Sequence, residues 1–156
     1  MVSKKIFPIS IFCCLLSLPV IGQNVDTAPS IPRIQLTPEI AVRWNVASQA
    51  VQHDDLFDSL RQRVKNRKHL SALIAAINDT TLLPFSSCAK KTNLRVGDIA
   101  YMALDQIKHI AVWRDLGFQC DVFTGNCHYC DFMFDAFEHN RYEMERKVRR
   151  VFGFKR

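Results

Sequence analysis

Four cysteines are the residues of this sequence with the greatest capacity for chemistry. Cys120, Cys127 and Cys130 lie close together, and Cys88 lies further upstream. Cys127 and Cys130 form a Cys-x-x-Cys pair that follows a turn at residues 124–126 and precedes an expected helix. A thiol at a helix N-terminus has a lowered pKa, which favours the reactive thiolate. The spacing therefore allows a thiol–disulfide redox couple.

The segment Asp121–Cys130 resembles the active-site strand, turn and helix of thioredoxin-type oxidoreductases. The resemblance implies a redox enzyme that uses Cys127 and Cys130, with Cys120 or Cys88 as a resolving or structural thiol. A fold of that type needs further strands and a helix after the pair, and a later cis-proline. Only 26 residues (156 minus 130) follow Cys130, and none of them is a proline. The similarity is therefore confined to this short segment.

The same cysteines fit other chemistries. Four thiolates, with His128 and His139 nearby, could ligate zinc tetrahedrally. Covalent haem attachment requires a histidine directly after the second cysteine, where this chain has Asp131. The interpretation that we favour is two structural disulfides and no cofactor or metal, because an even number of cysteines in an exported chain is typical of a disulfide framework. Four cysteines allow three pairings, and the sequence does not choose among them.

Export is predicted from the first 22 residues. They begin with the basic Lys4 and Lys5, continue with an apolar run, and end before a possible cleavage site. This is the layout of a secretory signal peptide, and the apolar run is too short to span a bilayer. Cys13 and Cys14 would leave with this leader. We therefore expect a periplasmic or extracellular protein.

Positive charge is concentrated in two blocks. The chain has a formal net charge of +6, which becomes +4 when Lys4 and Lys5 leave with the leader. Both blocks could bind an acidic protein or an anionic membrane surface, whereas export makes nucleic acid an unexpected partner. The alternative is two solvated helix faces with contacts such as Glu143 to Lys147. The expected partner-binding residues are Arg61, Arg63, Lys65, Arg67, Lys68, Arg141, Arg146, Lys147, Arg149 and Arg150.

Hydrolytic motifs are absent from the sequence. It contains no Gly-x-Ser-x-Gly elbow, no His-Glu-x-x-His and no phosphate-binding glycine loop. Asp131, Asp135 and Glu138 lie on one face of the last expected helix and could hold a cation or act as an acid–base set. A row of acids near a helix N-terminus is more often a solvated face.

Hydrophobic periodicity predicts a mainly α-helical domain, disulfide-reinforced, with about five helices and one short extended segment. After a flexible segment 23–36, the helical domain should cover residues 37–156. Its helices are expected at 37–52, 55–68, 70–77, 95–110 and from 131 onward, and its extended segment at 118–123. Thr37, Pro38 and Glu39 have the order typical of a helix start. The short apolar helix 70–77 should be central.

Together these features favour an exported, non-enzymatic protein that binds a partner protein, as an inhibitor or a toxin-neutralising immunity protein does. The alternative is the thiol–disulfide enzyme that uses Cys127 and Cys130. The disulfide map distinguishes the two hypotheses, because a Cys127–Cys130 bridge would support the enzyme.

Overall fold

The described part of the chain begins with a three-stranded antiparallel sheet. The computed structural model describes residues 31–123, 125 and 127–155, so the predicted leader lies outside the described residues. The sheet has the strand order β1-β2-β3, and its strands are β1 (Arg33–Thr37), β2 (Ile40–Asn45) and β3 (Ala50–Gln52). The expected helix at 37–52 was therefore wrong, and the fold is mixed α/β rather than mainly α. Residues 33–36 of the segment expected to be flexible lie in β1, whereas residues 23–30 of it lie outside the described residues.

The physical reason for the sheet lies in the alternation of its side chains. Ile34 pairs with Val42 across the first hairpin, and Trp44 pairs with Val51 across the second. All four side chains are buried. Because successive strand residues point to opposite faces, one apolar set covers the core. Pro38 stands in the two-residue connection between β1 and β2, where its fixed φ suits a turn as well as a helix start.

The remaining elements are helical. Asp54 begins α1, since its carboxylate accepts the N–H groups of Leu56 and Phe57 at 3.0 and 3.2 Å. Asn66 caps α2 in the same way, so the helix expected at 55–68 ends early and a second one starts. In chain order the helical elements are α1 (Asp55–Arg63), α2 (Arg67–Ala75), the 3-10 turn η1 (Ala76–Asn78), α3 (Val96–Ile107), the π turn η2 (Val112–Leu116) and α4 (Met133–Val151).

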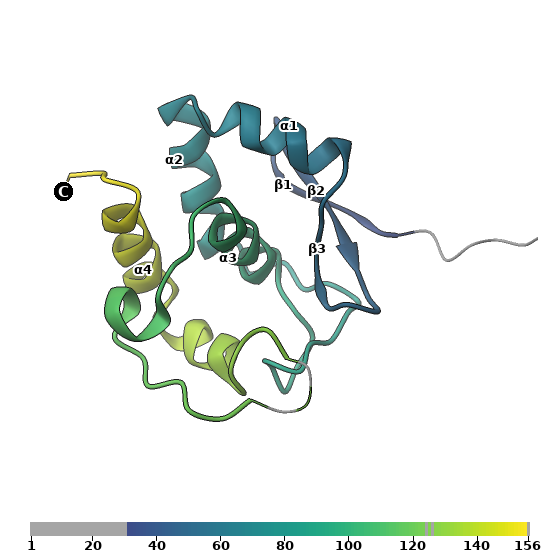
Figure 1. Ribbon diagram of the computed structural model, residues 1–156, viewed down its shortest axis with the longest axis vertical. Helices are drawn as coiled ribbons and strands as arrows, with labels where there is room; N and C mark the ends of the chain where they lie inside the picture. The colour runs from purple at the N-terminus through teal and green to yellow at the C-terminus, as the bar shows by residue number, and fades with distance from the viewer. Residues whose placement is uncertain (1–30, 124, 126, 156) are drawn as a thin grey trace, which may run out of the picture.

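The central helix is α3, not the expected helix at 70–77. Every residue from Val96 to Leu104 is buried, whereas α2 buries only Leu73 and Ile74. Figure 1 shows α3 between the sheet on one side and α4 on the other, with α1 and α2 above it. Its Tyr101 ring contacts the rings of Phe134 and Phe137 of α4 edge-on, at 6.0 and 4.8 Å between centroids.

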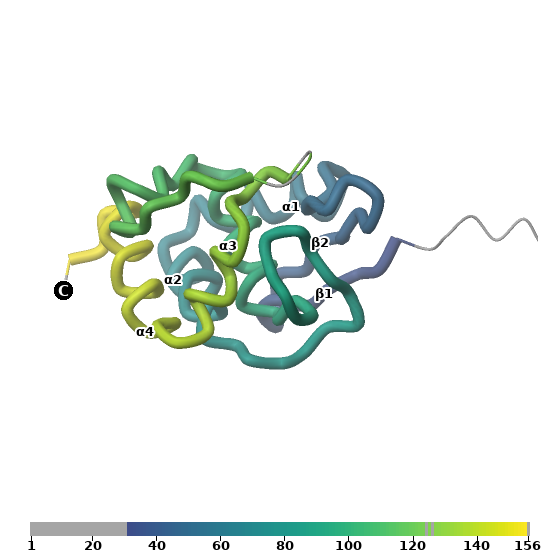
Figure 2. Tube along the Cα trace, turned by 90° about the horizontal axis from the view of Figure 1, so that it is seen from below, coloured from purple at the N-terminus to yellow at the C-terminus, as the bar shows by residue number. Residues whose placement is uncertain are grey.

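The segment 118–123, expected to be extended, contains no strand. It forms a loop in which the Val122 carbonyl accepts the Asp131 N–H at 2.9 Å. After this loop α4 starts at Met133, and its backbone leaves helical geometry at Asn140. Figures 1 and 2 place the end of α4 and the segment with η2 at one end of the molecule, away from the sheet.

Candidate partner-binding surface

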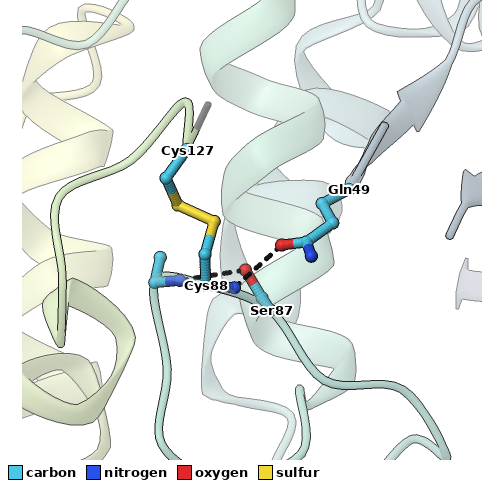
Figure 3. The surroundings of a disulfide bond; sticks show 5 residues. Gln49, Ser87, Cys88 and Cys127 are labelled. Atoms are coloured by element: carbon cyan, nitrogen blue, oxygen red, sulfur yellow. Dashed lines mark hydrogen bonds between the residues drawn. A yellow bond between two sulfur atoms is a disulfide. The ribbon is translucent and has the colours of Figure 1, made fainter. Parts of the chain in front are cut away.

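Two disulfides join the four described cysteines. Cys88 is bonded to Cys127, and Cys120 is bonded to Cys130. Figure 3 shows the first bridge, beside which the Cys88 N–H donates to the side-chain oxygen of Gln49 at 2.8 Å. The expectation of two disulfides is confirmed, and they indicate an oxidising compartment. Because Cys127 and Cys130 are each bonded outside their motif, this pairing gives no support to a redox couple between them.

The two bridges fix the segment from which α4 starts. Cys88–Cys127 connects the loop before α3 to the segment before α4, and Cys120–Cys130 closes the short loop between η2 and α4. The Phe134 N–H also donates to the Ala89 carbonyl at 3.3 Å. The cysteine cluster is therefore structural in this arrangement, since it positions the helix that carries the second basic block.

A buried ionic cluster lies where α3 meets α4. Asp98 is fully buried and accepts hydrogen bonds from Lys90 Nζ at 2.7 Å, from Arg141 Nη2 at 2.7 Å and from the Arg95 N–H at 2.8 Å. Arg141 also donates to the Ile77 carbonyl at 2.9 Å. Buried charges persist only when they are paired and hydrogen-bonded. Arg141 is therefore a core residue, and its inclusion among the expected partner-binding residues was wrong.

Glu138 closes this cluster at its more exposed edge. It accepts hydrogen bonds from Lys90 Nζ at 2.7 Å and from Arg95 Nε at 2.6 Å. These two cations lower the pKa of Glu138 from 4.5 to about 2. Asp135, its neighbour in the carboxylate row, accepts the Lys91 N–H at 3.0 Å. The carboxylates of Asp135 and Glu138 are thus committed to structural contacts.

Three histidines line a hollow of about 320 Å³ between α3 and the disulfide loop. His53, His109 and His128 surround it. Asp105 accepts a hydrogen bond there from the Tyr129 hydroxyl at 3.3 Å, and its other carboxylate oxygen lies 3.3 Å from His109 Nδ1. Burial raises the pKa of Tyr129 well above its usual value, so its hydroxyl remains a donor. Within the described residues, no three histidine, cysteine or acidic side chains lie close enough together to hold a metal ion.

The two basic blocks meet at one end of the molecule. Arg67, at the start of α2, stacks over the Phe154 ring at 4.3 Å and donates to the Gly153 carbonyl at 3.2 Å. Arg149 of α4 donates to the Ser71 hydroxyl of α2 at 2.8 Å. The blocks are about 80 residues apart in the sequence, so this convergence comes from the packing of α2 against α4.

The cations at this end differ in whether they have a carboxylate partner. Arg146, Lys147 and Arg149 form ion pairs with Glu143 or Glu145 on the same helix, as expected for a solvated face. Six others of the expected partner-binding residues, all exposed, form no ion pair with any described residue. We call these six the cationic face: Arg61, Arg63, Lys65, Arg67, Lys68 and Arg150.

The start of α2 adds to this positive potential. The first turn of α2 contains no acidic residue and carries Arg67 and Lys68 instead. Cations at a helix N-terminus oppose the macrodipole and cost roughly 0.3–1 kcal/mol each when exposed. The local arrangement is therefore unfavourable for the helix, which is the kind of exception expected at a functional surface.

Trp113 was not among the residues expected to bind a partner. It lies in η2 and exposes 70% of its surface, whereas Trp44 in the sheet is fully buried. In the sequence Trp113 lies just beyond the helix expected at 95–110. No pattern distinguished an exposed tryptophan from a buried one.

Comparison of the chain with protein-family models, with curated proteins and with solved structures found no match. No helix among the described residues has the length and apolar character needed to cross a membrane.

Proposed function

We propose that this protein is an exported, non-enzymatic binding protein that uses the cationic face to occupy an acidic partner protein. An inhibitor or a toxin-neutralising immunity protein acts in this way. The observation that supports the proposal is that two segments distant in the sequence meet where α2 packs against α4, and that both carry exposed cations without carboxylate partners among the described residues. The two disulfides and the predicted leader support export.

Unpaired cations suit a role in recognition more than one in stability. An exposed ion pair within the chain contributes about 0–1 kcal/mol, so the fold loses little by leaving these side chains unpaired. A surface of one sign accelerates the encounter with a partner of opposite sign and disfavours wrong partners. The cationic face should therefore raise the association rate, and this effect should weaken with salt, since the Debye length is about 8 Å at 0.15 M ionic strength.

The experiment compares two double variants with the same change of charge. Arg63→Gln with Lys65→Gln removes two cations from the cationic face, and Arg33→Gln with Lys91→Gln removes two exposed cations elsewhere. Tagged mature protein of each kind is incubated with envelope extract of the producing cells at about 0.05 M and about 0.15 M salt, and captured proteins are identified by mass spectrometry.

We expect wild type and the Arg33/Lys91 variant to capture the same acidic protein. The Arg63/Lys65 variant should capture much less of it at the lower salt, and this difference should shrink at the higher salt because the charges are screened. For the purified pair, the association rate should fall several-fold with little change in the dissociation rate. Recovery of no protein, or equal recovery by all three forms, would contradict the proposal.

A further inference from the structure

Trp113 is presented on a fixed turn. The Asp115 N–H donates to the Ala111 carbonyl at 2.7 Å, and the Asp115 carboxylate accepts the Ala111 N–H at 2.9 Å. Gly117 ends η2 in the left-handed conformation, with φ +70°. Lys147 Nζ of α4 then donates to the Leu116 carbonyl at 2.6 Å. A large aromatic side chain on so constrained a turn loses little conformational entropy when it binds.

An open hollow of about 450 Å³ lies beside this turn, between η2 and the end of α4. Arg114, Lys147 and Arg150 supply its positive charge, and Leu116 and Val151 supply part of its apolar lining. Arg114 is paired with Asp115 at 2.8 Å, whereas Arg150 has no ion pair among the described residues. Arg150 belongs to the cationic face as well, so one member of that face lines the hollow.

Charge decides what this surface can accept. An exposed tryptophan can fill an apolar pocket of a partner. The positive charge of the neighbouring hollow complements carboxylates on the rim of such a pocket. Tryptophan and arginine are the residues that most often dominate the binding energy at protein interfaces, while the charges around them set rate and specificity.

We propose that Trp113 is the aromatic anchor of the interface with the acidic partner, inserted into an apolar pocket of that protein while the partner's rim carboxylates face Arg114 and Arg150. This inference rests on the proposed function and adds the residue that provides most of the affinity. An anionic membrane would attract the same cations, so it is the alternative that the experiment must separate.

The experiment places a photo-crosslinker in the full chain. Trp113→p-benzoylphenylalanine is compared with Val46→p-benzoylphenylalanine, because Val46 is also exposed, at 59%, and lies in the turn between β2 and β3 at the opposite end. Irradiation of producing cells should join position 113, but not position 46, to one acidic protein. Adding Arg114→Gln and Arg150→Gln should reduce that product. With the purified partner, Trp113→Ala should raise Kd about 30-fold, as for a hot-spot tryptophan.

The outcomes separate this inference from the proposed function. Two outcomes overturn the anchor alone. In one, the cationic face captures a partner that position 113 does not crosslink. In the other, the Kd of the Trp113→Ala variant rises less than threefold. Crosslinking to lipid without protein overturns the anchor in favour of a membrane surface. Failure of capture in the first experiment overturns both.

Discussion

Arg141 carries a positive charge into the core because its partners are already there. Asp98 and the Ile77 carbonyl accept its hydrogen bonds, and Lys90 satisfies the other oxygen of Asp98. Removing one member of such a cluster leaves a buried charge without full compensation, which is more costly than losing an exposed pair.

Arg141→Ala should therefore lower the free energy of unfolding by about 4 kcal/mol, because Asp98 stays buried with one cation fewer. Arg146→Ala, which removes an exposed arginine of the same helix, should change it by less than about 0.5 kcal/mol. Urea unfolding of the oxidised proteins measures both values. Similar small losses would show that Arg141 is not embedded as described.

Glu138 should make stability depend on pH in the acid range. Its pKa is lowered to about 2 by the hydrogen bonds from Lys90 and Arg95, so its contribution is complete above pH 4.5 and is lost as the pH falls toward 2. Glu138→Gln should be less stable than wild type at pH 7, and the difference should shrink between pH 4.5 and 2. Glu39→Gln, an exposed change, is the control. A difference that stays constant down to pH 2 would contradict this assignment.

At the scale of elements, the contact between α3 and η1 determines where the ionic cluster forms. A Cβ at Gly97 would lie 2.2 Å from the Ile77 carbonyl oxygen and 2.6 Å from Arg141 Nη1. The absence of a side chain at Gly97 therefore lets α3 approach η1 closely enough for Arg141 to contact both.

Gly97→Ala should cost about 3 kcal/mol of unfolding free energy, because the backbone of η1 or α3 must move to relieve the overlap. Gly153→Ala separates close packing from backbone conformation. Gly153 has φ +72° and nothing within 4 Å of an added Cβ. Gly153→Ala should therefore lower the free energy of unfolding by only about 1 kcal/mol. Thermal unfolding of both variants tests this order. Equal losses would show that packing at Gly97 does not matter.

At the scale of the whole molecule, the two disulfides close loops of different length. The Cys88–Cys127 bridge spans 39 residues and the Cys120–Cys130 bridge spans 10. In the chain-entropy model a longer closed loop restricts the unfolded chain more.

Replacing Cys88 and Cys127 by serine should therefore destabilise the protein by roughly 4 kcal/mol, and replacing Cys120 and Cys130 by roughly 3 kcal/mol. Denaturant unfolding of the two double variants gives the comparison. Peptide mapping of the non-reduced wild type should recover the two cross-linked pairs. Four free thiols, or a Cys127–Cys130 bridge, would contradict the pairing and revive the redox hypothesis.

Part of the fold followed from local patterns. Asp54 as a helix cap, the apolar stripe of α4 and the presence of two disulfides could all be read from residue types and spacing. The structure of residues 33–52 could not be predicted in this way, because Ile40 and Trp44 fit a helical period and a strand alternation equally well. The pairing of Ile34 with Val42 decided between them, and that contact exists only once the hairpin forms.

The sequence alone determined which residues carry charge, which carry sulfur and where helices could be capped, because these depend on residue type and near neighbours. Only the tertiary structure decided what each charge does. Arg141 falls in the apolar stripe between Phe137 and Met144, which was a signal for burial, but its partners Asp98 and Lys90 come from other elements. Packing of α2 against α4 likewise joined the two basic blocks, since long-range contacts fix which side chains share a surface.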